Sequence, residues 1–189
     1  MFQGYGVSSN PTRWIGTEAG TAPYPNWSPN DANAPGGGDP QGANFVPGEV
    51  DTTLQLNDEW FYVKGHGIRT LAELQTVYHN SVGRNANLLL DIAPTPEGVV
   101  DDAAFARYKE FGDWIRACYG DGNVIAETTT SLELDLTKTV GAAGATIDRI
   151  ILQEDQSKGC VHYSSPERRV FLSVDKCYFC RWSWCQYRQ

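Results

Sequence analysis

Apolar residues recur at helical spacing in two segments of the chain. In residues 70–82 they fall on one helical face and comprise Leu71, Leu74, Val77 and Tyr78. In the second segment Asp101 and Asp102 can cap a helix that stops at Gly120. The apolar residues expected on the buried face of that helix are Phe105, Tyr108, Phe111, Trp114, Ile115 and Cys118. The spacing therefore predicts two amphipathic helices.

A short, continuously apolar run lies between these helices. It covers residues 86–92 and is ended by Pro94. Continuous rather than alternating apolarity is typical of a strand that is buried on both faces, as in a parallel sheet. The order loop, helix, strand, helix predicts an α/β fold and is typical of the end of an α/β barrel.

The hydrophobic period changes after residue 124. Leu132, Leu134 and Leu136 alternate with acidic residues, and residues 147–152 form a second strand-like run. Two such strands around a Gly/Ala-rich turn predict that residues 125–157 begin an antiparallel β-sandwich. A closed sandwich needs about seven or eight strands, so this one stops short.

Residues 21–48 predict a long irregular loop, because they contain six prolines and the run Gly36-Gly37-Gly38. Compact domains seldom hold such a long loop without a functional reason. A linker is one interpretation. The aromatic residues in and around the segment favour a structured, ligand-facing loop instead: Trp14, Trp27, Phe45 and Trp60.

The net charge of −8 argues against nucleic acid as a partner, because phosphate binding needs a basic surface. No apolar stretch approaches the ~20 residues of a membrane span. The N-terminus shows no basic region followed by an apolar core, so we expect no secretory signal in this chain. Its abrupt start predicts truncation.

Residues 158–189 differ in composition from the rest of the chain. They hold six basic residues against two acidic ones, and four of the five cysteines. We expect an aberrant, disordered Cys/Arg-rich tail that arises from a gene-model error. Cys177, Cys180 and Cys185 suggest a metal knuckle, but zinc needs four ligands and only Cys160 and His162 could complete the set. We therefore expect no metal and no cofactor.

Glu18 is the first candidate for chemistry. Cleavage of a glycoside needs a carboxylic acid that protonates the leaving oxygen and a second carboxylate on the other side, with aromatic rings that stack on the sugar. Glu18 is flanked by small residues, and Arg13 and Trp14 precede it on the same segment. The alternative is a solvated loop carboxylate, since charged residues are mostly exposed.

A second cluster comprises Glu49, Asp51 and Trp60. Val50 separates the two acidic residues, so both carboxylates point to one face of an extended chain. Trp60 could form the floor of a sugar site. An edge strand with ordinary surface charges is the alternative interpretation.

Four segments in order resemble the α-L-fucosidases of glycoside hydrolase family 29. Residues 13–20 resemble the family's RW-x-G-N-E-x-G segment, and residues 45–51 resemble W-V-P-A-E-x-D. Residues 60–62 resemble the aromatic G-W-F-W/Y segment, and residues 78–90 resemble Y-x-x-S-V-G-R-N-x-x-L-L-L-N. The similarity is strongest to the branch that prefers α-1,3/1,4-fucosides, with its plant and fungal relatives.

The resemblance implies a retaining α-L-fucosidase that acts on fucosylated glycans. It implies that residues 1–124 are the C-terminal half of a (β/α)8-type, TIM-like barrel, followed by the β-sandwich. By motif position Glu18 is the acid/base, and Arg13, Trp14, Glu49 and Trp60 approach the fucose or its neighbouring sugars. Enzymes of this kind are typically secreted or lysosomal.

The sequence departs from the family pattern in three ways. Thr17 replaces the Asn before the acid/base, and Asp91 replaces the Asn that ends the buried strand; we expect Asp91 to be structural. The family's nucleophilic Asp and fucose-binding His residues lie before the segment of Glu18, so we expect this chain to be a truncated form that is inactive alone. An exposed half-barrel predicts association.

Two alternatives to this interpretation stay open. One is a non-catalytic carbohydrate-binding or interaction protein that derives from a fucosidase. The other is an active enzyme that uses Asp51 or Asp91 as its second carboxylate, which requires a carboxyl–carboxyl separation of about 5 Å for retention or roughly 6.5–9.5 Å for inversion.

Overall fold

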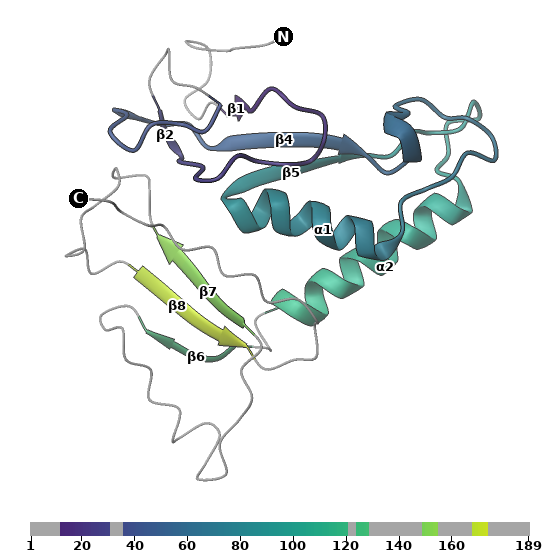
Figure 1. The fold of residues 1–189 in the computed structure, drawn as a ribbon. Helices are drawn as coiled ribbons and strands as arrows, with labels where there is room; N and C mark the ends of the chain where they lie inside the picture. The colour runs from purple at the N-terminus through teal and green to yellow at the C-terminus, as the bar shows by residue number, and fades with distance from the viewer. Residues whose placement is uncertain (1–11, 31–35, 121–123, 129–148, 155–167, 174–189) are drawn as a thin grey trace. The chain divides into compact units, whose positions relative to one another are not determined.

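The computed structural model describes residues 12–30 and 36–120, together with three strands at 124–128, 149–154 and 168–173 (Figure 1). The chain forms two compact units, whose division falls between Phe111 and Gly112. The first unit holds a parallel sheet and the second an antiparallel one.

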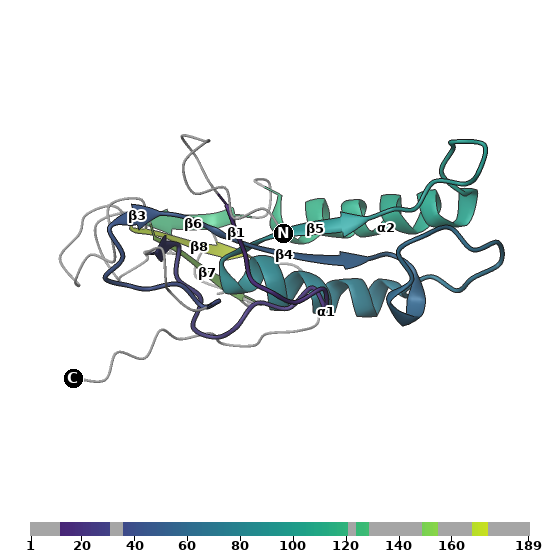
Figure 2. The same ribbon diagram turned by 90° about the horizontal axis from the view of Figure 1, so that it is seen from above.

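The parallel sheet of the first unit has three strands in the order β1-β4-β5. These are β1 (Arg13–Trp14), β4 (Gly48–Thr53) and β5 (Ala86–Asp91), and both pairings are parallel. β4 and β5 run side by side in both views (Figure 1, Figure 2). The strand predicted over residues 86–92 is confirmed, and so is the α/β class.

Helix α1 (Leu71–Ser81) covers one face of this sheet. It confirms the first predicted helix. A capping box begins it, in which the Thr70 hydroxyl accepts from the Glu73 backbone N–H and the Glu73 carboxylate accepts from the Thr70 N–H. The core under the helix comprises Ala22, Val50 and Ala86, with Ile15 and Leu88 packed against it.

The opposite face of the sheet is open to solvent at Leu89. Its side chain is 48% exposed, so the prediction that β5 is buried on both faces is wrong for that residue. A continuous apolar run indicates only that the side chains on both faces of a strand are apolar enough to be buried. In the described residues only α1 covers the sheet, on the face that carries Val50 and Thr52.

Helix α2 (Asp102–Tyr119) confirms the second predicted helix. Phe111 is buried and meets the Tyr78 ring edge-on at 6.1 Å. The predicted buried face is wrong for Phe105 and Tyr108, because Phe105 is 61% exposed and Tyr108 is also exposed. Their apolar character fits a helical stripe, but in the described part of the first unit only Phe111 of that stripe is buried.

The segment between β1 and β4 is ordered around a small antiparallel ribbon of β2 (Pro29–Asn30) and β3 (Asn44–Phe45). Asn26 is buried and donates to the backbone oxygens of Arg84 and Asn85 at 3.0 and 2.8 Å. These contacts tie the loop to the turn η2 (Val82–Arg84) before β5. The linker interpretation is therefore wrong for residues 21–30 and 36–48.

The second unit contains β6 (Val124–Thr128), β7 (Arg149–Glu154) and β8 (Arg168–Ser173) in the antiparallel order β6-β8-β7. The change of period near residue 124 corresponds to the start of β6, and β7 covers most of the strand predicted at 147–152. The strand predicted at 132–136 lies outside the described residues.

Strand β8 corrects the prediction of a disordered tail for residues 168–173. It is the central strand of its sheet and pairs on both sides. Residues 158–189 are basic and cysteine-rich as a whole, and this overall composition does not reveal the short apolar run within them. In that run Val170, Phe171 and Leu172 are residues that favour strands. The other residues of that predicted tail, including the cysteines and His162, lie outside the described part.

Candidate active site

Trp14, Glu49 and Asp51 project from the sheet face opposite α1. Trp14 pairs with Glu49 across β1 and β4. Burial alternates along the first five residues of β4, with Glu49 and Asp51 partly exposed and Val50 buried. The prediction that the two carboxylates share a face is thus confirmed. The edge-strand alternative is wrong, because β4 is the central strand of the sheet.

Glu18 lies on a short loop that is pinned to β4 at both ends. The Ile15 N–H donates to the Glu49 carbonyl at 3.0 Å, and the Gly20 N–H donates to the Asp51 carbonyl at 2.9 Å. Four residues therefore bulge out between two neighbouring acceptors of β4. Glu18 is exposed on this bulge.

Gly20 fixes the return of the loop to the sheet. It has a φ of +64°, and a Cβ there would lie 2.9 Å from Val77 Cγ1 and 3.0 Å from Thr52 Cγ2. The backbone passes this close to α1 and β4 because glycine has no side chain. This close approach explains physically why the Glu18 segment ends in glycine.

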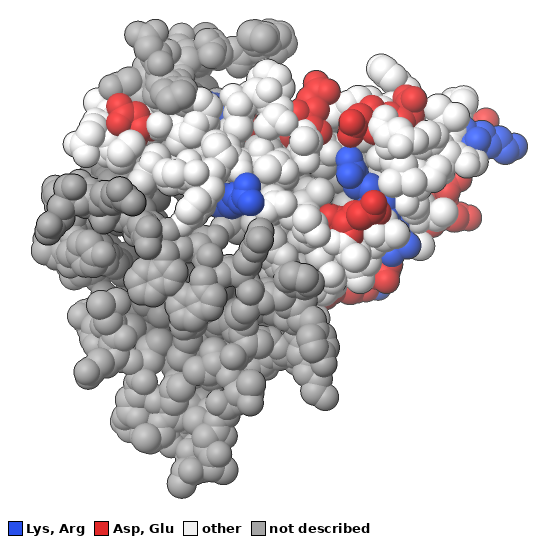
Figure 3. Space-filling view, viewed as in Figure 1, with Lys and Arg blue, Asp and Glu red and all other residues white. Residues whose placement is uncertain are grey.

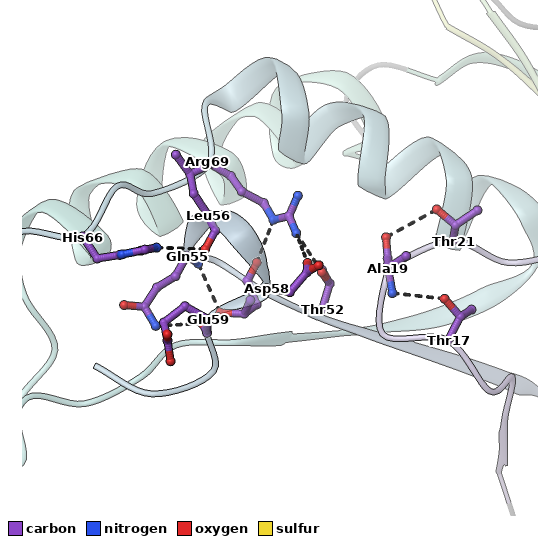
Figure 4. A network of polar contacts seen from close by, with 11 residues as sticks. Thr17, Ala19, Thr21, Thr52, Gln55, Leu56, Asp58, Glu59, His66 and Arg69 are labelled. Atoms are coloured by element: carbon purple, nitrogen blue, oxygen red, sulfur yellow. Dashed lines mark hydrogen bonds and ion pairs between the residues drawn. The ribbon is translucent and has the colours of Figure 1, made fainter. Parts of the chain in front are cut away.

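Thr17 shapes the loop around Glu18. Its Oγ1 accepts a hydrogen bond from the Ala19 N–H at 3.2 Å, and the Thr21 hydroxyl donates to the Ala19 carbonyl at 3.4 Å (Figure 4). A Thr hydroxyl that accepts from the backbone two residues later makes a turn of the same kind as Asn. The Thr17 substitution that we noted in the sequence therefore keeps a turn that spans Glu18.

Trp14 is held in orientation by Asp51. The indole Nε1–H donates to Asp51 Oδ1 at 2.7 Å, across 37 residues of sequence. The Trp14 side chain nevertheless stays 45% exposed. An indole that is fixed at its N–H and open on its surface is suited to stack on the apolar face of a sugar.

Arg13 points the other way from Trp14 and is only 7% exposed. Its guanidinium donates to the Trp27 carbonyl at 2.8 Å, to Asn26 Oδ1 at 3.2 Å and to the Gly36 carbonyl. These groups belong to the loop between β1 and β4. The structure thus places Trp14 beside Glu49 on one face, carries Glu18 on a loop whose two ends are tied to β4, and places the Arg13 side chain on the buried side.

Trp60 lies on a loop beyond the carboxyl end of β4 and is partly buried. The Gln55 side chain donates to the carbonyls of Glu59 and Phe61, both at 2.8 Å. The Arg69 guanidinium donates to the Thr53 carbonyl at 2.8 Å. Polar side chains, rather than an apolar core, therefore hold the loop that carries Trp60.

Phe61 is a residue of this loop that the sequence analysis did not single out. It is 81% exposed, yet its N–H donates to Glu59 Oε1 at 3.2 Å and its carbonyl accepts from Gln55. An exposed ring on a fixed backbone is a feature of binding surfaces. Its place between Trp60 and Tyr62 is the one sequence signal that could have indicated it.

Asp91 ends β5, in register with Thr53 of β4. Burial raises the pKa of its carboxyl above the ordinary value. Its Oδ2 is buried and makes no hydrogen bond within the described residues. Burial of this carboxyl therefore favours its neutral form.

Acidic and basic side chains are mixed on the face of the first unit that Figure 3 shows. Among the residues that the structure describes, no cluster of three or more His, Cys, Asp or Glu side chains could hold a metal ion. None of the helices within the described ranges is both long enough and apolar enough to cross a membrane.

Comparison with known proteins places this site in a family. The Alpha-L-fucosidase family matches residues 25–121. α-L-Fucosidase 1 of Arabidopsis thaliana is 33% identical over 111 residues, which make up 53% of this chain and 22% of that protein. The match to the family begins after Glu18, so the role of Glu18 depends on its own geometry and motif.

Solved structures from the α-L-fucosidase family also superpose on this chain. A structure from Bacteroides thetaiotaomicron superposes with a TM-score of 0.67 at 32% identity, over 78% of this chain and 37% of that one. A GH29 fucosidase of Ruminococcus gnavus in complex with fucose superposes with a TM-score of 0.52 at 33% identity, over 58% of this chain and 24% of that one.

The chain spans about a quarter of the length of the curated relatives that it matches. The family match nevertheless covers half of the chain, and the structural likeness extends over more of it. The chain therefore belongs to the α-L-fucosidase family, glycoside hydrolase family 29.

Proposed function

We propose that the chain serves the hydrolysis of α-L-fucosides from glycans, with retention of configuration, and that Glu18 is the acid/base. The pinned loop of Glu18 beside the oriented Trp14 ring is the observation that carries this proposal. Glu18 gives a proton to the leaving oxygen and then takes one from the water that releases fucose.

The other residues of the sheet face bind the sugar in this proposal. Trp14 stacks on its apolar face, and Glu49, which shares that face of β4, accepts from sugar hydroxyls. Trp60 borders the site from the loop after β4. Arg13 has a different role from the one predicted: we assign it to supporting the β1–β4 loop, because three acceptors of that loop take up its guanidinium.

We also propose that β1, β4 and β5 are part of the wall of a (β/α)8-type barrel. Their parallel order, with α1 on one face and an exposed Leu89 on the other, supports this assignment. Further barrel strands, or association with another chain, would close the open face. Preference for α-1,3/1,4-linked fucose is part of the same proposal, on the motif resemblance.

Hydrolysis by Glu18 variants tests the proposal. Where further barrel strands or an associated chain complete the site, we expect Glu18→Gln to reduce release of fucose from an alkyl α-L-fucoside by about 100-fold or more. The 189-residue chain alone is predicted to be inactive. The loss should be smaller for an aryl fucoside, because its leaving oxygen needs little protonation. Equal loss on both substrates contradicts the role of Glu18 as the proton donor.

A non-catalytic carbohydrate-binding protein is the second candidate. One observation favours it: the Asp51 carboxylate, which is a candidate second carboxylate, accepts from the Trp14 indole instead. Binding of fucosylated glycans on an array, without release of fucose from an aryl α-L-fucoside, would support this candidate. The same assay tests the prediction that the chain is inactive alone.

A further inference from the structure

Asp51 holds the Glu18 segment at two points. Its carboxylate accepts from the Trp14 indole N–H at 2.7 Å, and its backbone carbonyl accepts from the Gly20 N–H at 2.9 Å. Trp14 lies four residues before Glu18, and Gly20 lies two residues after it. One residue of β4 therefore binds the segment on both sides of the proposed acid/base.

We propose that Asp51 is a positioning residue, which clamps the segment from Trp14 to Gly20 against β4 and orients both the Trp14 ring and the Glu18 loop. The clamp itself depends only on hydrogen bonds within this chain. Its consequence for sugar binding rests on the function proposed above.

The chemistry of the pair suits orientation. A carboxylate is a strong acceptor for an N–H donor, and hydrogen bonds with an ionised partner are stronger than neutral ones. The bond removes rotational freedom from an indole that would otherwise turn in solvent, so less entropy is lost when a sugar stacks on it.

The position of Asp51 on β4 makes the clamp specific. Glu49 and Asp51 share one sheet face, but only the carboxylate of Asp51 is bonded to Trp14 in the described residues. The neighbouring Glu49 contributes its carbonyl to the Ile15 N–H at 3.0 Å. Asp51 is thus the one residue of the strand that holds the segment by side chain and backbone together.

The clamp gives Asp51 a role that differs from that of a second catalytic carboxylate. Asn retains an oxygen that can accept from the indole, but it cannot act as a nucleophile or a base. A positioning role therefore predicts that Asp51→Asn behaves nearly like the wild type and that Asp51→Ala does not. A catalytic role predicts that both substitutions are equally harmful.

The test uses the ¹H–¹⁵N signal of the Trp14 indole in the full 189-residue chain, which Trp14→Phe identifies by its loss. We expect Asp51→Ala to shift this signal and to weaken binding of methyl α-L-fucoside about 5- to 10-fold. Asp51→Asn should stay within about 2-fold of the wild type in binding. Glu97→Ala, which removes an exposed carboxylate outside the site, should change neither measurement.

Each outcome decides a separate point. An indole signal that is unmoved by Asp51→Ala overturns the clamp. Equal loss of binding in Asp51→Asn and Asp51→Ala overturns positioning in favour of a role that needs the charge. A normal indole response in a wild-type chain that does not bind the fucoside supports the clamp and contradicts the proposed function alone.

Discussion

Asp91 is a residue at which a difference from the family motif is expected to lower the stability of the folded chain. Its family position is Asn in the resemblance drawn above, whereas here a carboxyl with a buried Oδ2 ends β5. Burial favours the neutral form of the acid and so raises its pKa from the ordinary value of 3.8. The ionised form is correspondingly unfavourable in the folded chain.

Asp91→Asn should therefore stabilise the protein at neutral pH. Below the unfolded pKa both states of the wild type are protonated, and no cost of ionisation arises. As the pH rises through the raised folded pKa, the wild type loses stability relative to the variant. Thermal unfolding should show a higher midpoint for the variant than for the wild type at neutral pH, and the difference should shrink on acidification. An advantage that grows on acidification contradicts this account.

Gly20 gives a second prediction at the residue scale. A methyl group there would approach Val77 and Thr52 to about 3 Å, and the positive φ adds strain. Gly20→Ala should lower the free energy of unfolding by about 1–3 kcal/mol, as measured by urea denaturation. Gly65→Ala is a matched control, because Gly65 also has a positive φ but a Cβ there would meet nothing within 4 Å. Equal losses in both variants would leave the steric argument without support.

Arg13 and Trp14 show what the sequence could and could not predict about the site. Both belong to the motif that resembles the family segment, and both were predicted to approach the sugar. In a strand, neighbouring side chains point to opposite faces, so only one of the two can lie on the open face. The choice between them depended on which face α1 covers, and that is a tertiary contact.

At the scale of elements, helix α1 was predictable because its apolar spacing and its capping residues agree. Thr70 and Glu73 form the capping box, and Leu74 and Val77 lie on the buried face. The loop that carries Trp60 was not predictable in the same way. Its supports are long polar side chains, Gln55 and Arg69, that reach backbone oxygens, and no hydrophobic period reports such contacts.

The α1 cap is open to test by Thr70→Ala. Loss of the hydroxyl leaves the Glu73 N–H without its acceptor, and a lost N-cap typically costs about 0.5–2 kcal/mol in stability. Thr76→Ala serves as the control, since the Thr76 hydroxyl donates to the Ala72 carbonyl within the helix and does not cap it. Urea denaturation should show the larger loss for Thr70→Ala, and a reversed order contradicts the cap.

The same cap predicts a pH dependence. Hydrogen bonds from the Thr70 backbone N–H, and then from its hydroxyl, lower the pKa of the Glu73 carboxyl. Stability from this group is present above its unfolded pKa of about 4.5 and is lost as the pH falls through the lowered folded pKa. Glu73→Gln should therefore show a smaller loss of stability between neutral and acid pH than the wild type does. If the wild type and Glu73→Gln lose equal amounts of stability between neutral and acid pH, this account is contradicted.

Strand β8 is an element that the composition of its segment did not predict. The mean composition of residues 158–189 predicted disorder, while the local run of Val170, Phe171 and Leu172 favours a strand. A strand forms only when partners are available, and β6 and β7 supply them on both sides. Pairing across such distances in sequence is a property that composition does not report.

At the scale of the whole molecule, the sequence indicated the family and the α/β class, and both are confirmed. The four ordered motifs lie on structural parts with distinct tasks. They supply the Glu18 loop, strand β4, the polar-braced loop after it, and the α1–β5 connection. Two of these parts, the Glu18 loop and the loop that carries Trp60, follow the carboxyl ends of the parallel strands β1 and β4, which lie at one edge of the sheet.

The central claim is that the open sheet face around Trp14 and Glu18 is a site for α-L-fucosides. Titration of the Trp14 indole signal of the full chain with methyl α-L-fucoside tests it most directly, with the mirror-image methyl α-D-fucoside as the control. We predict a saturable shift with the L-sugar and little response to the D-sugar. No shift with the L-sugar, or equal shifts with both enantiomers, would contradict the claim.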